Sequence, residues 1–199
     1  GFCDDVKAAA EQIAGAPGIT IISHIDADGI SCEAILSQAI SRQGIAVKSV
    51  FVRQLEPLTM PQVPSDNTLK VFSDLGAGQQ NLFLERGFTE KEVLIVDHHV
   101  SQPCEREYTQ VNCLPYGHDR MSAAGVSYLI AKQLDPANTD LAKLAIVGNV
   151  GDMMAREKCG LVGHARDIIV EDGVRHKNVE VRKKDLNCYG TATRPVHLS

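Results

Sequence analysis

Three short apolar segments in this chain each run directly into acidic or histidine residues. Ile19–Ser23 is apolar and rich in β-branched residues, which is typical of a buried strand. Segments 70–74 and 92–96 predict two more strands. The residues at the ends of the three segments are His24, Asp26 and Asp28, then Asp74, and then Asp97, His98 and His99. The chain must therefore adopt a fold that tolerates many charged groups at its strand ends.

Helical patterns separate these strands. Apolar residues at positions 30, 34, 35 and 39 follow a helical period and predict a helix over 30–41, and residues 46–52 predict a further strand. The other expected helices span 4–14 (capped by Asp4 or Asp5), 79–86, 122–134, 139–150 and 161–171, with a loop of about twenty residues after His99. Strands that alternate with helices predict an α/β fold, a parallel sheet flanked by helices.

The end of the chain differs in character from the rest. We expect residues 1–172 to form one catalytic domain, which is an ordinary size for a single core. Residues 173–199 are polar and basic, and predict a short irregular segment, either a hairpin or a partly ordered arm. We interpret them as a C-terminal extension or as the start of a second domain that this chain lacks.

Composition narrows the cellular setting. No stretch approaches the roughly 18 apolar residues of a membrane helix. The N-terminal residues include Asp4 and Asp5 and lack the apolar core of a signal peptide. None of the six cysteines forms a C-x-x-C pair, so we expect a reduced, cytoplasmic protein without membrane association. An alternative for one region is a structural zinc ion, because five potential ligands crowd there. These are His98, His99, Cys104, Cys113 and His118.

The net charge does not decide the substrate class. A formal charge of −5 at first argues against a polyanionic substrate. Five of the acids, however, are Asp26, Asp28, Asp74, Asp97 and Asp152, which we assign to one site. Two divalent cations there would bring the total to −1, so a nucleic acid remains compatible with the chain.

The strand-end clusters have the chemistry of a cation site. The carboxyl ends of parallel strands meet at one edge of a sheet, so these clusters should converge in space. A single aspartate such as Asp74 after a strand is explained by a simple turn or helix cap. Three strands that all end in acidic or histidine residues indicate a binding site instead. Carboxylates suit Mg²⁺ and Mn²⁺, and histidine raises the preference for Mn²⁺. We therefore predict two Mn²⁺ or Mg²⁺ ions, a pair that can promote attack on phosphorus.

Four motifs carry a resemblance to a known family. They are His24-Ile-Asp26-Ala-Asp28-Gly29, Ser73-Asp74-Leu-Gly76, Asp97-His98-His99 and Gly148-Asn-Val-Gly151-Asp152. In order and spacing they resemble the motifs of the DHH phosphoesterase superfamily, and within it the RecJ branch with its archaeal GINS-associated nucleases. The segments Ser122–Val126 and Gly190–Pro195 are similar to that group as well. The chain resembles only the catalytic DHH domain, because a Gly-Gly-Gly-His-like motif of the DHHA1 domain is missing.

The resemblance implies roles for individual residues. The implied metal ligands are Asp26, Asp28, Asp74, His98 and Asp152, with His24 as a ligand or a close neighbour of one. Asp74 would bridge the two ions, and Asp97 would orient a histidine. His99 would contact the scissile phosphate, although a buried structural histidine is the alternative. Ser122 and Gly125 begin a helix whose free N–H groups suit a phosphate, but a plain serine cap is about equally compatible. The loop over 76–78 also could approach a phosphate or simply turn the chain.

Three functions fit these residues. The first is a metal-dependent exonuclease on single-stranded DNA or RNA, with 5′ to 3′ polarity implied by the resemblance. The second is a phosphodiesterase for small substrates such as oligonucleotides, cyclic dinucleotides or pyrophosphate; its usual H-x-x-x-D-x-D spacing differs from the H-x-D-x-D found here. The third is a replisome scaffold that docks on GINS-type partners. A scaffold that had lost catalysis should lack ligands, yet every expected position is filled, so we favour the nuclease.

Overall fold

The computed structural model describes residues 1–118, 120–155, 161–163, 165–182, 185–188 and 196–198. Its centre is a five-stranded sheet in the order β2-β1-β3-β4-β5, and all neighbouring strands are parallel. The strands are β1 Ile19–His24, β2 Val47–Val52, β3 Leu69–Ser73, β4 Val93–Asp97 and β5 Thr109–Asn112. The predicted α/β fold with a parallel sheet flanked by helices is confirmed.

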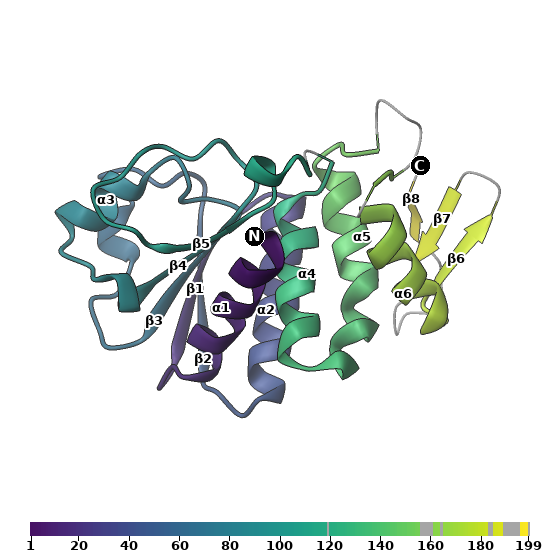
Figure 1. The fold of residues 1–199 in the computed structure, drawn as a ribbon, viewed down its shortest axis with the longest axis horizontal. Coiled ribbons are helices and arrows are strands. Elements are labelled where there is room, and N and C mark those ends of the chain that lie inside the picture. Colours follow the sequence, from purple (N-terminus) through teal and green to yellow (C-terminus); the bar gives the residue numbers. More distant parts are fainter. Residues whose placement is uncertain (119, 156–160, 164, 183–184, 189–195, 199) are drawn as a thin grey trace.

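Helices cover both faces of this sheet (Figure 1). The α-helices are α1 Phe2–Ala14, α2 Ala27–Arg42, α3 Gln80–Glu85, α4 Ala123–Leu134, α5 Ala142–Gly151 and α6 Glu171–Arg175. Short 3-10 turns span Met60–Gln62, Glu90–Glu92, Leu114–Tyr116 and Pro136–Leu141, and a π-helical turn spans Ala165–Val170. Helix α3 lies on one side of the sheet, and α1, α2 and α4 lie on the other. Helix α5 forms a further layer beyond α2 and α4.

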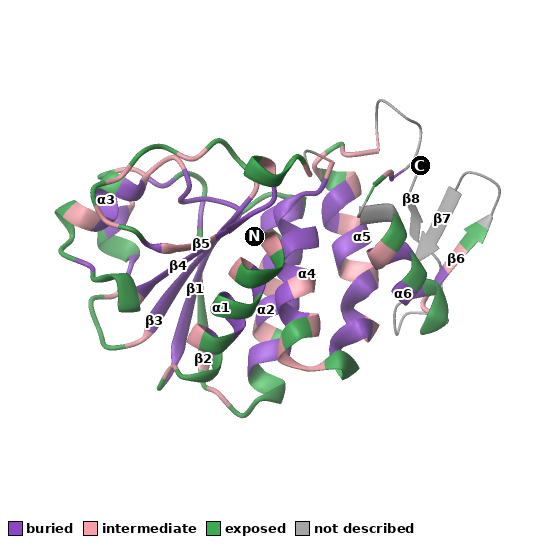
Figure 2. Ribbon diagram, viewed as in Figure 1, coloured by how far each residue is buried: buried purple, intermediate pink, exposed green. Residues whose placement is uncertain are grey.

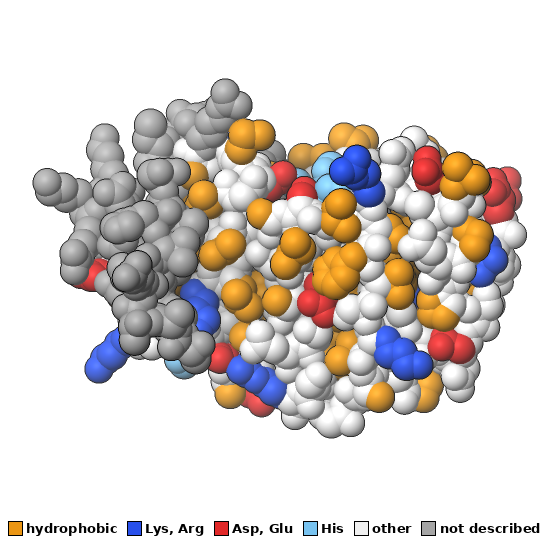
Figure 3. All heavy atoms as spheres, turned by 180° about the vertical axis from the view of Figure 1, so that it is seen from behind, with side chains coloured by type: hydrophobic (Ala, Val, Ile, Leu, Met, Phe, Trp, Pro, Cys, Tyr) orange, Lys and Arg blue, Asp and Glu red, His pale blue; other side chains and the backbone are white. Residues whose placement is uncertain are grey.

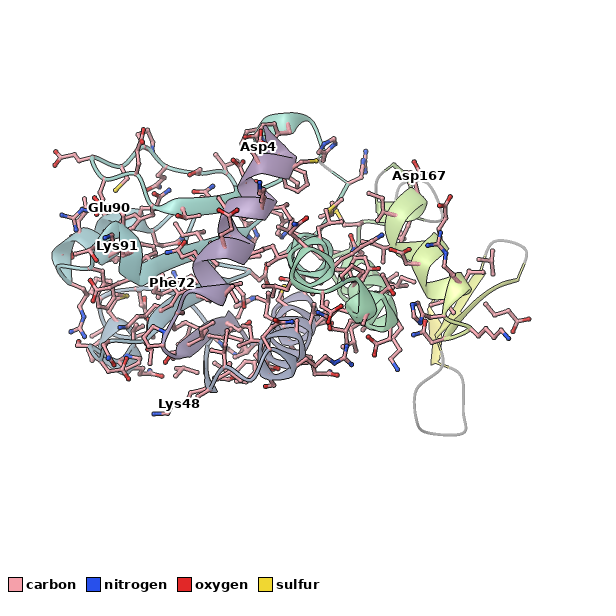
Figure 4. The ribbon with its side chains drawn as sticks, turned by 60° about the horizontal axis from the view of Figure 1, so that its bottom comes forward. Asp4, Lys48, Phe72, Glu90, Lys91 and Asp167 are labelled. Carbon is pink, nitrogen blue, oxygen red and sulfur yellow. The ribbon has the colours of Figure 1, made fainter. Side chains whose placement is uncertain are left out.

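Three apolar clusters join these layers. Ile21, Val71 and Leu94 face α1, α2 and α4, whereas Phe72 and Ile95 face the α3 side. The third cluster joins α2, α4 and α5, whose facing surfaces are buried in Figure 2. Seen from below, α4 and α5 lie side by side (Figure 4). The three central strands are almost wholly buried, which explains why their sequences are largely apolar.

Some element boundaries differ from the sequence expectation. Helix α1 starts at Phe2, and Asp4 lies in its first turn, where its carboxylate accepts a 2.6 Å hydrogen bond from the Gly1 amino group. Strand β5 was expected to be loop, because its sequence Thr-Gln-Val-Asn contains a single apolar residue. It forms at the sheet edge by pairing with β4 and packing against α1. The predicted helix over 139–150 begins as a 3-10 turn before α5, and the one over 161–171 divides into the π-helical turn and α6.

The compact unit extends past the expected boundary at residue 172. Val179 is only 4% exposed and belongs to the same apolar cluster as α4 and α5. Gly173 lets it approach, since a Cβ at that glycine would lie 2.5 Å from Val179 Cγ2. Asp172 accepts hydrogen bonds of 2.6 Å from both Tyr128 Oη and Lys132 Nζ. Gly173 and Val179 therefore pack with the folded core, whereas residues 174–177 between them are exposed.

A small antiparallel sheet follows. Strand β6 Val179–Arg182 pairs with β7 Asp185–Cys188, and β7 pairs with β8 Val196–Leu198. Of the two structures expected for the tail, a hairpin or a partly ordered arm, β6 and β7 form a hairpin. The predicted motif segment Gly190–Pro195 lies outside the described residues. Among the helices that the structure describes, none is both long and apolar enough to cross a membrane.

Candidate metal centre

The sheet register brings the three strand-end clusters together. Ser23 of β1 is aligned with Ser73 of β3, and Ser73 is aligned with Val96 of β4. The next residue along each strand is His24, Asp74 and Asp97, respectively. Acidic and histidine side chains consequently gather at one edge of the molecule, near its upper rim in Figure 3.

Asp74 lies between two groups of potential ligands. Its Oδ1 is 3.4 Å from His98 Nε2, and its Oδ2 is 3.4 Å from His24 Nδ1. The backbone of Asp74 is left-handed, with φ of 59°, a conformation that turns the chain sharply after β3. His24 Nδ1 also lies 3.0 Å from Asp26 Oδ2, while Asp26 Oδ1 accepts a hydrogen bond from Gly29 N at the start of α2. Each carboxylate oxygen of Asp74 therefore faces a separate histidine.

Helix α5 carries Asp152 to the same place. Gly151 permits this approach, because a Cβ there would lie 2.6 Å from Ala27 Cβ in α2. Asp152 Oδ2 lies 3.5 Å from His98 Nε2, and Asp28 Oδ2 lies 3.8 Å from the same nitrogen. All six predicted ligands, His24, Asp26, Asp28, Asp74, His98 and Asp152, thus occur in three overlapping groups whose ligand atoms lie within 4.8 Å of one another.

Asp97 holds the adjacent histidine. Its Oδ1 lies 2.8 Å from His99 Nδ1 and accepts the backbone N–H groups of His98 and His99. Its Oδ2 accepts Ala77 N, in the loop expected to turn the chain or approach a phosphate. The side chain of His99 is 60% exposed, so the alternative of a buried structural histidine does not apply. The hydrogen bond to Asp97 raises the pKa of His99 to about 9, so the imidazole is a cation at neutral pH.

The start of α4 is already occupied by a carboxylate. Asp28 Oδ1 accepts Ser122 Oγ at 2.7 Å and Ala124 N at 3.0 Å, and Asp28 Oδ2 accepts Ala123 N at 2.9 Å. Ser122 is fully buried, and a Cβ at Gly125 would lie 2.5 Å from Met121 Cγ. The prediction that Ser122 and Gly125 bind phosphate is therefore wrong for this geometry: Asp28 takes the place of the anion.

The electrostatics of the site favour a cation. Burial, and then the charges of Asp28 and Asp26, raise the pKa of Asp74 to about 7 against the lowering effect of His98. Burial raises the pKa of Asp28 and Asp152 as well. His98 Nε2 is buried and has no hydrogen-bond partner, although it faces three carboxylates. A buried imidazole nitrogen that has no hydrogen-bond partner and is surrounded by carboxylate oxygens is suited to bind a divalent cation.

A cavity of about 440 Å³ opens beside these groups. Its lining includes His24, Asp26, Asp74, His99 and Asp152. Arg53 and Gln54, which follow β2, line the same cavity. Nothing in the sequence singles out Arg53, because a single arginine after a strand carries no distinctive pattern. It brings a positive charge to a site otherwise dominated by acids.

The zinc alternative is not supported by the structure. Cys113 Sγ donates to Met121 O, and Cys104 packs at the edge of the cluster on the α3 side. The ring of His118 contacts Phe2, with centroids 5.6 Å apart. Within the described part of the chain, the potential metal groups contain none of these three residues.

A parallel sheet whose strand ends gather carboxylates and histidines around one shared aspartate defines an α/β protein with a candidate dinuclear metal centre. The chain belongs to the DHH family, since the family model for the DHH family, N-terminal domain, matches residues 18–149. Members of this family are metal-dependent phosphoesterases.

Individual proteins are similar to this chain in sequence or in fold. An uncharacterised protein of Methanocaldococcus jannaschii is 28% identical over 187 residues, which cover 88% of this chain and 41% of that protein. A manganese-bound exonuclease RecJ has a similar fold, with a TM-score of 0.67 and 21% identity over 85% of this chain and 47% of that one. RecJ of Thermus thermophilus with Mn²⁺ gives a TM-score of 0.68 and 23% identity, covering 86% and 26%. The chain thus spans less than half the length of these relatives.

Proposed function

We propose that the chain is a two-metal phosphodiester hydrolase, a RecJ-like exonuclease that acts on single-stranded DNA or RNA from the 5′ end. The main support is Asp74, whose two carboxylate oxygens each lie 3.4 Å from a different histidine. A carboxylate in that position can serve two cations at once. We further propose Asp26, Asp28, Asp74, His24, His98 and Asp152 as the residues that hold Mn²⁺ or Mg²⁺.

Two cations would supply Lewis acidity and charge neutralisation at the scissile phosphate. The protein's own side chains have separate tasks. His99, held cationic by Asp97, points its exposed ring into the cavity and can stabilise negative charge that develops on a phosphate oxygen. Asp97 fixes the orientation of that ring through Nδ1.

Arg53, which also lines the cavity, adds a contact for the substrate. Its guanidinium can bind phosphate oxygens in a forked geometry. Arg53 and His99 together place two cationic side chains along one cavity. We propose that they hold the terminal part of a phosphodiester chain across the carboxylates.

A hydrolysis assay tests the proposal. Single-stranded DNA and RNA, labelled at the 5′ or the 3′ end, would be incubated with Mn²⁺, with Mg²⁺ and with EDTA. We expect metal-dependent release of mononucleotides from the 5′ end. Metal-independent cleavage, or equal cleavage by an Asp74→Asn variant, would contradict the assignment of the site.

The small-substrate alternative is favoured by the limited cavity. A volume of about 440 Å³ is in the range of small-molecule sites rather than of an extended strand. Aromatic residues for base stacking are also scarce, at 5% of the chain. Comparing a dinucleotide with a long single strand separates the two: hydrolysis of the dinucleotide alone would identify the small-substrate enzyme.

Partners and location are part of the same proposal. A replisome role predicts that GINS-type subunits retain the protein in a pull-down against an unrelated bait. No enrichment would count against docking. Cys3, Cys32 and Cys104 are reduced thiols, which is compatible with the cytoplasmic location that we propose. We also propose that substrate grip depends on a second domain of the DHHA1 type, supplied outside these residues.

A further inference from the structure

The carboxylate of Asp28 is nearly saturated by hydrogen bonds from its own protein. Oδ1 accepts two donors, Ser122 Oγ and Ala124 N, and Oδ2 accepts one, Ala123 N. An ionised carboxylate offers about four lone-pair positions in total. Both positions on Oδ1 are therefore used, and a single position remains on Oδ2, the oxygen that lies 3.8 Å from His98 Nε2.

Asn149 fixes the donors in place. Its Oδ1 accepts the backbone N–H of Ser122 at 3.0 Å, and its Nδ2 donates to Ala145 O at 2.7 Å. Both Ser122 and Asn149 are fully buried, so neither can turn toward water. Asn149 lies three positions before Asp152 in the sequence, and its two hydrogen bonds join the start of α4 to α5.

We infer that Ser122 and Asn149 are positioning residues that restrict Asp28 to binding a cation through Oδ2 alone. This inference rests on the proposed function, because it needs a cation beside Asp28. Ser122 would therefore not bind phosphate. Its hydroxyl would instead donate to Asp28 Oδ1, the oxygen that a second bond from Asp28 to the cation would need.

Restricting a carboxylate to one oxygen selects among cations. Ca²⁺ takes 6–8 oxygen ligands and often binds both oxygens of a carboxylate, whereas Mg²⁺ accepts fewer ligands in a tighter shell. A site that withholds Asp28 Oδ1 should therefore discriminate against Ca²⁺. Removing the Ser122 hydroxyl frees a lone pair on Oδ1 and should relax that discrimination.

The test measures cation binding by the intact chain without substrate. Mn²⁺ affinity is obtained from the electron paramagnetic resonance signal of free Mn²⁺, and Ca²⁺ affinity from competition. We expect Ser122→Ala to raise the ratio of Ca²⁺ affinity to Mn²⁺ affinity about tenfold, a typical effect of removing a partner of a metal ligand. Ser127→Ala is the matched control, because Ser127 is equally buried in the same helix and makes no bond to Asp28.

The possible outcomes distinguish a failure of the proposed function from a failure of the inference about Asp28. Failure of the unsubstituted chain to bind Mn²⁺ would overturn the proposed function and this inference with it. Mn²⁺ binding with the same affinity ratio in the unsubstituted chain and both variants would overturn the inference alone. Should Ser122→Ala fail to fold, a crystal structure of the unsubstituted chain grown with Mn²⁺ decides. We expect Oδ2 on the cation and the Ser122 bond retained, and both oxygens on the cation would overturn the inference.

Discussion

Gly148 packs directly against Asp28: a Cβ at Gly148 would lie 2.7 Å from Asp28 Oδ1 and 2.3 Å from Ala124 Cβ. The glycine of α5 therefore permits the close contact among α2, α4 and α5 on which the site depends. This contact gives the Gly148-Asn-Val-Gly151-Asp152 motif a packing role in addition to its acid.

Gly148→Ala should damage both stability and cation binding. The added methyl must push α5 away from α2, which we expect to cost about 1–3 kcal/mol of unfolding free energy. Urea unfolding measures that loss, and Mn²⁺ titration should show weaker binding because Asp28 and Asp152 separate. Gly15→Ala, where the nearest atom to a Cβ is 3.5 Å away, should change neither. Unaltered Mn²⁺ affinity in Gly148→Ala would contradict this account.

Asp74→Asn should remove hydrolysis. Asparagine tolerates the left-handed backbone at this position, so the fold should persist, whereas alanine would add strain. We expect the rate to fall by more than about 100-fold, beyond the usual effect of losing a group that merely supports a ligand. The increase of Tm on adding Mn²⁺ should disappear as well. Asp167→Asn, at an exposed position of the π-helical turn, is the control and should behave like the unsubstituted chain.

Asp97→Asn should separate cation binding from catalysis. Asp97 touches His99 but belongs to none of the metal groups among the described residues. The variant should retain Mn²⁺ affinity within a few-fold while hydrolysis falls about 100-fold, because His99 loses its charge and its orientation. Calorimetric Mn²⁺ titration beside the nuclease assay distinguishes the two effects. Loss of Mn²⁺ binding and hydrolysis together would assign Asp97 to the metal centre.

Asp172 should make stability depend on pH. Burial acts in the opposite direction, but hydrogen bonds from Lys132 and Tyr128 hold the pKa of Asp172 below its ordinary value. A lowered pKa means that the stabilisation is fully present above the unfolded value of about 3.9 and is lost as pH falls through the folded pKa. Asp172→Asn should cost about 2 kcal/mol at pH 7. Urea unfolding from pH 7 down to pH 3 should show the two proteins converging; a constant difference would refute the ionic contribution.

The fold could be predicted where local sequence decides it. The buried strands β1, β3 and β4 are largely apolar segments, and their ends carry the clusters that the sheet register brings together. Strand β5 could not be predicted, since its pairing with β4 rather than its composition makes it a strand.

The outcome at α4 has a different cause. The hydroxyl and free N–H groups at the start of a helix can bind any nearby anion, and the sequence does not show whether that anion is a phosphate or a carboxylate of the protein. Asp28, 94 positions earlier in the chain, reaches that helix start only after α2 packs on α4. The packing of Val179 could not be predicted for a similar reason, because its apolar partners come from distant positions in the sequence.

Val179 also bears on the order in which the molecule can form. It shares one apolar cluster with Cys32 and Ile35, residues near the opposite end of the sequence. A chain emerging from the ribosome with its N-terminus first can pair its early strands, yet it cannot close this cluster until Val179 is available. Contacts between such distant positions slow folding, because a long loop must be ordered before they form. The acids on α2 and α5 would thus reach their final positions only after Val179 has packed into this cluster, so that metal capture by this site would follow folding.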